Sequence, residues 1–383
     1  LVGSEMCIRD SLRATCYGDI MVRRVLLARG ASLPTNNGLG RAHHSIESIL
    51  NNALVPNWTK ASVVEHEITS NLFLRLFNRW IKHPKKVTFE TSKEGIDLLH
   101  ITDQEQAHLV PYNSPIPVAV TIHDFFHIRP RTIEAGDVYI SVGENKPNAI
   151  RKRDLIKLKE GLLRADILIC ISEETKLEAE KMFPSKKTFL VRHDVDVDYW
   201  NPYKNPISRD IISDFDLESK CLVITVGTNA PRKRLDFINK VFLNLPKNIR
   251  EDINLVNIGS EIKVSEKQLI SFFQHAEVLL FPSISEGFGY PPAEAMAAGC
   301  PVIAADLPAH NEIIPQNCLV DPVNIDQWVS RIIKIHDDWL RSGKADRIPD
   351  DELIKHVNDL LSPKKHGLEL SKAYDKAINS FKK

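Results

Sequence analysis

The chain has 383 residues and a mass of 43.4 kDa, and its 50 basic residues balance 50 acidic ones. Hydrophobic residues make up 43% of the composition, which is enough for two domain cores and excludes a wholly disordered chain. The balanced charge argues against a dedicated nucleic-acid binder, and no apolar run reaches the roughly 18 residues that span a bilayer.

Residues 1–20 carry neither apolar periodicity nor the apolar core of a secretory leader. Residues 1–12 resemble a translated sequencing-adapter artefact, so we expect the natural chain to start at Met21; a genuine disordered extension is the alternative. The six cysteines form no CxxC and show no metal-ligand spacing, which favours a reducing, cytoplasmic compartment.

From residue 21 onward, short β-branched strands alternate with longer helices, which predicts parallel sheets covered by helices. The strands predicted in the first half are residues 25–28, 62–64, 97–101, 118–122 and 167–171. The helices predicted there are residues 41–51, 151–164 and 173–183, the last with Ser172 as its N-cap.

The alternation restarts after a turn-rich segment, residues 198–206. The strands predicted in the second half are residues 222–226, 253–258, 277–281, 302–304 and 318–320. We therefore predict two α/β domains, residues 21–203 and 204–362. Ligands of such sheets bind at the carboxyl ends of the strands, so a cleft between the domains is expected.

The segment 277–312 predicts one complete β-loop-α-β unit. Tyr290-Pro-Pro292 starts its helix because proline suits a first helical turn, and Gly299 followed by Pro301 ends it. This unit places a loop and a helix N-terminus directly after a buried strand, where backbone amides and helix polarity favour an anion.

Two carboxylates flank the loop of this unit, Glu286 and, eight residues later, Glu294. A carboxylate can accept two hydrogen bonds from a vicinal diol, so the pair suits ribose and sugar hydroxyls. Gly287 and Gly289 leave the backbone amides between them unshielded. The alternative is that Glu294 complements the helix dipole and Glu286 is solvated.

The string Glu286-Gly-Phe-Gly-Tyr-Pro-Pro-Ala-Glu294 resembles the E-x7-E signature of retaining glycosyltransferases of family 4, which have the GT-B fold. The resemblance implies two Rossmann-like domains facing a central cleft, with the closing segment 363–383 crossing back to the first domain. It also implies that Glu286 contacts the donor sugar and Glu294 the ribose. The loop of Gly287, Phe288 and Gly289 would contact the sugar or the diphosphate.

A second match follows the strand at 222–226, where Arg232 and Lys233 stand near a predicted helix N-terminus. Cations there oppose the helix dipole, which indicates an anionic partner; a solvated basic turn is the alternative. In the family the equivalent cations hold the donor diphosphate. Many members carry an arginine where this chain has Thr228, so either Arg232 or Arg234 could supply that charge.

The N-terminal half matches the family more sparsely. Gly38 and Gly40 lie in a loop that resembles the family's glycine loop, which lets donor phosphates and acceptor approach the backbone; a bare turn is the alternative. His123 ends a predicted strand and matches the histidine that faces the donor sugar, although a purely structural histidine is equally compatible with the sequence.

The resemblance implies transfer of a hexose from a GDP- or UDP-linked sugar to a hydroxyl of a glycan or lipid-linked acceptor, with retention of configuration. Glu286, His123 and Lys233 would be the catalytic residues, and no metal or other cofactor is expected. Similarity to polysaccharide mannosyltransferases favours GDP-mannose. A GT-B epimerase or phosphorylase, and a non-catalytic sugar-nucleotide-binding paralogue, stay open as alternatives.

Two further segments have alternative interpretations. Asp194, Asp196 and Asp198 form overlapping D-x-D text that elsewhere holds a divalent cation, but we assign no metal to it. Residues 73–86 are basic and aromatic, and we expect their aromatic face to pack on the first sheet. The alternative is contact with an anionic membrane, at its inner face, that presents a lipid-linked acceptor.

Overall fold

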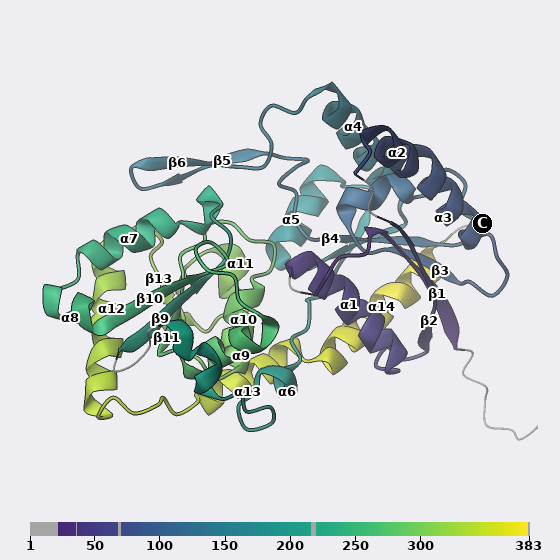
Figure 1. The fold of residues 1–383 in the computed structure, drawn as a ribbon. Helices are drawn as coiled ribbons and strands as arrows, with labels where there is room; N and C mark the ends of the chain where they lie inside the picture. The colour runs from purple at the N-terminus through teal and green to yellow at the C-terminus, as the bar shows by residue number, and fades with distance from the viewer. Residues whose placement is uncertain (1–21, 36, 68–69, 216–219, 382–383) are drawn as a thin grey trace, which may run out of the picture.

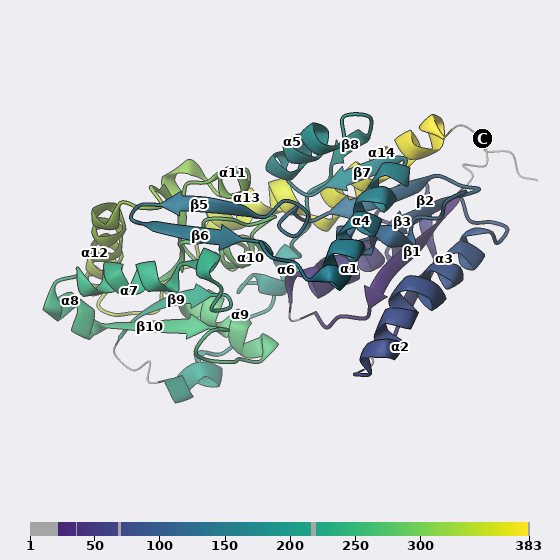
Figure 2. The same cartoon turned by 90° about the horizontal axis from the view of Figure 1, so that it is seen from above.

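The structure is a computed structural model that describes residues 22–35, 37–67, 70–215 and 220–381. The predicted extension, residues 1–20, lies outside them. Two α/β domains stand side by side (Figures 1 and 2), each built on a parallel sheet. In the described part of the chain the strand orders are β2-β1-β3-β4-β7-β8 and β10-β9-β11-β12-β13. The predicted pair of parallel α/β domains is confirmed.

The strands of the first sheet are β1 (Arg23–Ala31), β2 (Trp58–His66), β3 (Leu98–Ile101), β4 (Val118–Ile122), β7 (Ile167–Cys170) and β8 (Lys187–Leu190). The central strands β3, β4 and β7 are fully buried, as apolar runs predict. The prediction missed β8, because this edge strand is exposed or half-buried and has no apolar run.

Helices cover both faces of the first sheet. They are α1 (Gly38–Asn51), α4 (Ala149–Arg164), α5 (Glu173–Met182) and the segment α2 (Leu72–Phe77), η1 (Asn78–Lys82), α3 (His83–Thr91). The helix α1 packs with one face of the sheet, whereas α3, α4 and α5 pack with the other. Ser172 caps α5 by accepting the Thr175 N–H, as predicted.

The last helix, α14 (Pro363–Ser380), crosses back to the first domain. Leu370, Ala373 and Tyr374 join the core that Val25 of β1 shares with α1. The Tyr374 hydroxyl lies 2.7 Å from His100 Nδ1. The predicted return of the closing helix is confirmed.

The strands of the second sheet are β9 (Cys221–Val226), β10 (Ile253–Ile258), β11 (Val278–Phe281), β12 (Val302–Ala305) and β13 (Leu319–Val320). The helices around it are α7 (Leu235–Leu243), α8 (Lys247–Asp252), α9 (Glu266–His275), α10 (Tyr290–Ala297), α11 (Pro308–Asn311), α12 (Ile325–Arg341) and α13 (Asp351–Leu361). The short α6 (Val197–Trp200) precedes this domain.

A hairpin of β5 (Arg131–Ala135) and β6 (Val138–Val142) leaves the first domain and lies over the second (Figures 1 and 2). Ile140 packs with Ile284, and Arg131 Nη2 lies 3.2 Å from Ser285 Oγ. This hairpin is not among the strands predicted from the sequence. It joins the two domains beside the loop that contains Glu286.

The expected packing of the 73–86 aromatic face on its own sheet is wrong for the start of this segment. Phe73 is 83% exposed and Phe77 is 51% exposed. Arg79 and Trp80 turn inward instead, where both donate to Asp154. The α2 stripe therefore points to solvent. Among the described residues, no helix combines the length and apolar character needed to cross a membrane.

Candidate functional site

The β11–loop–α10 unit forms as predicted and faces the first domain. Pro291 and Pro292 stand in the first turn of α10, and Gly289 before it takes a left-handed φ of 96°. At Gly287 a Cβ atom would lie 2.1 Å from the backbone oxygen of His123. Only glycine permits this approach of the two domains, which brings the predicted loop against the predicted histidine.

Glu286 lies in a buried cluster of opposite charge. Its Oε1 atom lies 2.6 Å from Lys233 Nζ and 2.7 Å from Arg232 Nη1, and it accepts a short hydrogen bond from Ser283. Burial alone would raise the pKa of Glu286, but the two cations hold it down at about 2. The carboxylate is therefore ionised at neutral pH, and predicted residues from two loops meet at one oxygen.

The basic turn separates its two arginines. Arg232 and Lys233 belong to the single turn η4 (Pro231–Lys233) and point to the Glu286 loop, where Arg232 also donates to the Ser285 carbonyl at 2.8 Å. Arg234 is buried elsewhere, with its guanidinium over the Phe237 ring and near the Pro322 carbonyl. Arg232, and not Arg234, therefore lies with Lys233 at the Glu286 carboxylate.

Glu294 is buried on α10 and pairs with Arg41 of α1, across the two domains. The Arg41 guanidinium lies over two aromatic rings, 5.5 Å from the centre of Trp200 and 5.7 Å from that of Tyr290. Arg41 directly follows Gly40 and begins the helix predicted at 41–51, but it is not among the site residues predicted from the sequence. Its position directly after Gly40 was the available signal.

The glycine loop itself forms the start of α1. Asn37 caps the helix by accepting the Gly40 N–H at 2.7 Å. Gly38 faces the second domain, since a Cβ atom there would lie 3.6 Å from the Tyr290 ring. Both predicted glycines thus lie at the helix end that approaches α10.

His123 has both ring nitrogens engaged. Its Nε2 lies 2.9 Å from the Thr102 carbonyl, which can only accept, so this nitrogen carries the proton. Its Nδ1 then accepts from His193 Nε2 at 3.1 Å. Burial lowers the pKa of His123 and, still further, that of His193, so both rings are neutral at pH 7. What His123 presents to the Gly287 loop is its backbone carbonyl.

His193 connects this histidine to the second domain. Its ring stacks on Tyr290 at 5.5 Å and meets the edge of Phe288 at 5.3 Å. His193 directly precedes the D-x-D text and is not among the site residues predicted from the sequence. In the sequence, the available signal was a histidine directly followed by an aspartate, His193-Asp194.

The D-x-D carboxylates do not converge. Asp194 is buried and joins His366 of α14 at 2.6 Å and Ser45 of α1, whereas Asp196 and Asp198 are exposed. Burial would raise the pKa of Asp194, but the His366 hydrogen bond keeps it low. Within residues 22–35, 37–67, 70–215 and 220–381, no group of three or more His, Cys, Asp or Glu side chains is arranged to hold a metal ion.

Comparison with known proteins places this part of the chain in a family match. Residues 262–349, which include the β11–loop–α10 unit, match the family model described as glycosyl transferases group 1. Over 74 residues the chain is 42% identical to the O-antigen chain mannosyltransferase RfbU of Salmonella typhimurium, covering 19% of this chain and 21% of that protein. Over 252 residues it is 24% identical to the D-inositol 3-phosphate glycosyltransferase of Mycolicibacterium smegmatis, covering 58% and 55%. The chain thus spans from about a fifth to about half the length of these relatives.

Solved structures extend the likeness over the whole fold. Sucrose-phosphate synthase from Thermosynechococcus elongatus superposes with a TM-score of 0.66 at 16% identity, covering 94% of this chain and all of that one. Anabaena HepE in complex with UDP gives 0.62 at 11% identity, covering 92% and 100%. The chain therefore has the GT-B fold, and the comparisons together support a GT-B glycosyltransferase.

Proposed function

We propose that the chain is a retaining hexosyltransferase that moves a sugar from a nucleoside diphosphate to a hydroxyl of a glycan or lipid-linked acceptor. The observation that carries the proposal is the cluster of Glu286, Lys233 and Arg232 beside His123, with Glu294 eight residues along on α10. The two carboxylates belong to one loop-helix unit, and the two adjacent cations reach it from η4. Together these groups suit a ligand that combines a diphosphate with sugar hydroxyls.

In this proposal Lys233 and Arg232 hold the diphosphate and stabilise the charge that develops on it as the sugar leaves. Glu286 accepts from hydroxyls of the transferred sugar, and Glu294 from the ribose. His123 and the loop of Gly287, Phe288 and Gly289 close the sugar site from both domains. Gly38 and Gly40 let the phosphates and the acceptor approach α1.

The bond between the anomeric carbon and the phosphate oxygen breaks while a bond from that carbon to the acceptor oxygen forms on the same face. The acceptor proton passes to the departing phosphate, so charge and atoms balance. A double displacement would need a free carboxylate nucleophile. Glu286 fits that role poorly, because two cations and Ser283 already share its oxygen. Same-face displacement gives retention without such a nucleophile.

We include no metal in this mechanism, because Lys233 and Arg232 can neutralise the diphosphate themselves. We favour GDP-mannose as donor, since RfbU, which is 42% identical over its matched part, is named a mannosyltransferase. The relatives' roles in O-antigen synthesis support a polysaccharide or lipid-linked glycan as the acceptor.

A thermal-shift screen of GDP- and UDP-sugars tests the donor, because a ligand that binds only the native state raises its stability. The Glu294→Gln variant is the matched comparison, because loss of the ribose contact should reduce the rise in melting temperature that the nucleotide sugar causes. Anomeric analysis of the product by NMR then tests the reaction. A retained glycoside supports the proposal, whereas an epimerised sugar, a sugar phosphate or binding without turnover would contradict it.

A further inference from the structure

The α2–η1 segment exposes a contiguous set of large apolar side chains at the end of the first domain. These are Leu72, Phe73, Leu74, Phe77 and Ile81, all exposed. Phe73, Phe77 and Ile81 recur every four residues, so they form one stripe along the helix. Single exposed apolar residues are ordinary, but a cluster of this kind indicates an interaction surface.

The charge of the same segment has one sign. Arg75, Lys82, Lys85 and Lys86 are exposed beside the apolar stripe, and residues 70–89 contain no aspartate or glutamate. The inner cation, Arg79, is neutralised by Asp154 at 2.9 Å, so the unbalanced charge lies on the outer side. An exposed apolar stripe with a row of cations fits an anionic surface that also has an apolar interior.

The neighbouring helix α4 adds to this surface. Arg153 and Lys157 lie 5.5 and 5.1 Å from the centre of the Trp80 ring, which joins the two elements. Ile156 on the same helix is also exposed. The apolar and cationic area therefore continues from η1 onto α4, which Trp80 of η1 contacts.

We propose that this surface docks on an anionic lipid bilayer and lies in the plane of the membrane. It is here called the α2 face and consists of Leu72, Phe73, Leu74, Phe77, Ile81, Arg75, Lys82 and Lys85. Amphipathic helices of this composition insert their apolar stripe at the boundary between headgroups and acyl chains while their cations meet anionic headgroups. Because residues 70–89 hold cations and exposed apolar side chains but no acidic residue, a surface with anionic headgroups and an apolar interior fits this segment better than a protein partner does.

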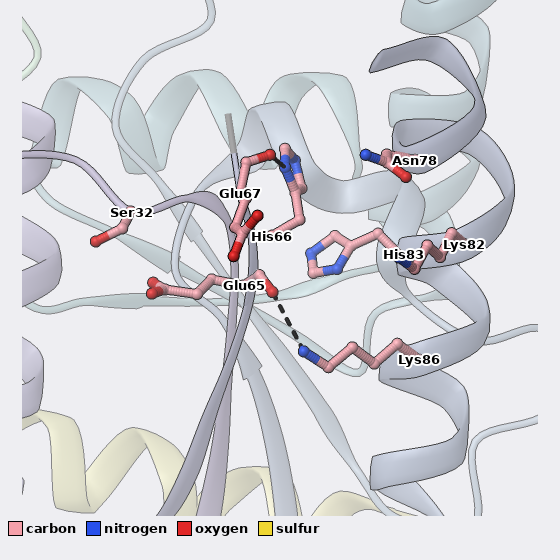
Figure 3. Close-up of a pocket in the computed structure, with 8 residues that line it drawn as sticks. All are labelled: Ser32, Glu65, His66, Glu67, Asn78, Lys82, His83 and Lys86. Carbon is pink, nitrogen blue, oxygen red and sulfur yellow. Dashed lines mark hydrogen bonds between the residues drawn. The ribbon is translucent and has the colours of Figure 1, made fainter. Parts of the chain in front are cut away.

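Docking in this way would bring a pocket to the lipid surface. The pocket, of about 680 Å³, lies between the end of β2 and the same helical segment (Figure 3). Lys82 and Lys86 line one side, and Glu65 and Glu67 line the other. The segment follows the carboxyl end of β2, the end of the sheet that faces the second domain.

This mixture of ammonium and carboxylate groups suits the phosphate and hydroxyls of a lipid headgroup. The idea that this headgroup is the acceptor depends on the proposed transferase function. The docking of the α2 face on a membrane does not depend on that function.

Sedimentation with vesicles tests the docking on the full chain, without any nucleotide sugar. We expect binding to phosphatidylcholine vesicles that contain phosphatidylglycerol, weaker binding to phosphatidylcholine alone, and loss of binding at high salt. Phe73→Ser with Phe77→Ser should weaken binding by roughly tenfold or more, because each substitution removes an apolar side chain that the bilayer would bury. Arg75→Gln with Lys85→Gln should weaken it by about fivefold for each lost cation.

Leu243→Ser with Ile348→Ser is the matched control, since these side chains are 70% and 84% exposed in the second domain. It should bind vesicles like the parent. All variants should keep the parent's thermal stability and nucleotide affinity, so a failure of docking is distinguishable from a failure of the transferase. Equal binding to both kinds of vesicle, or unchanged binding of the Phe73/Phe77 variant, overturns the proposal. So does a lipid-free dimer of the parent that the Phe73/Phe77 substitutions convert to monomer.

Discussion

Replacing Lys233 by alanine tests the proposed diphosphate site most directly. The side chain is largely buried, and its ammonium lies 2.6 Å from Glu286 Oε1. Burial lowers the pKa of Lys233, and Glu286 acts against that shift. The substitution removes one of the two cations at this oxygen and leaves Arg232 as the other.

The expected loss follows from the kind of contact removed. A charge-assisted hydrogen bond contributes about 1.5–3 kcal/mol, so affinity for a nucleoside diphosphate should fall about 10- to 150-fold. The nucleoside alone has no diphosphate and should bind as it does to the parent. Glu286 loses part of what holds its pKa at about 2, so that pKa should rise towards its usual range.

Calorimetry with GDP, UDP and the two nucleosides measures both affinities. Arg234→Gln is a matched control, because Arg234 belongs to the same basic turn but points to Pro322 instead of Glu286. It should leave diphosphate affinity unchanged, provided that its melting temperature shows a folded protein. Equal diphosphate affinity of Lys233→Ala and the parent would refute the proposed role of Lys233 in binding the diphosphate.

Three other outcomes are expected. Glu294→Gln should mainly raise the KM for the donor and weaken nucleotide binding, whereas Glu286→Gln should mainly lower kcat, because the sugar changes charge and shape during transfer and the ribose does not. Steady-state kinetics in which neither variant differs from the parent would contradict this. Turnover should persist in excess EDTA, and activity that is abolished and then restored by Mn²⁺ would return Asp194, Asp196 and Asp198 as metal-ligand candidates. The pKa of Glu286 is depressed, so its stabilisation is present above its ordinary pKa of 4.5 and is lost as pH falls through about 2. Urea titrations measure the free energy of unfolding of the parent and of Glu286→Gln. The difference between the two should be smaller at pH 3 than at pH 7 by about 2 kcal/mol, and a difference that does not change with pH would be contrary evidence.

Much of the fold could be predicted because local patterns determine it. The runs at β3, β4 and β7 are buried on both faces and read as continuous apolar segments. The hairpin β5–β6 could not be predicted in this way. Its strands alternate between exposed and buried residues, and its buried side chains face Ile284 of the other domain. That partner is set by the arrangement of the domains and not by local sequence.

The exposure of α2 was missed for a similar reason. Phe73 and Phe77 have helical spacing, and such spacing normally predicts a stripe that packs on a core. Here the inward positions are taken by Arg79 and Trp80, because buried Asp154 of α4 attracts both. Asp154, on a helix that is far away in the sequence but adjacent in space, therefore determines which side of this segment faces the protein.

Spacing also determines which site residues come together along the chain but not which ones meet across the domains. The eight-residue interval places Glu286 in the loop and Glu294 in α10, as expected. Arg41 and Lys233, which neutralise them, come from elements far away in sequence. Both buried carboxylates are therefore paired in the structure, since an unpaired buried charge is costly. Under the proposed function, ribose must displace Arg41 from Glu294, and the diphosphate must compete with Glu286 for Lys233. Donor binding is then an exchange of partners, so its free energy is the difference between the contacts formed and those opened.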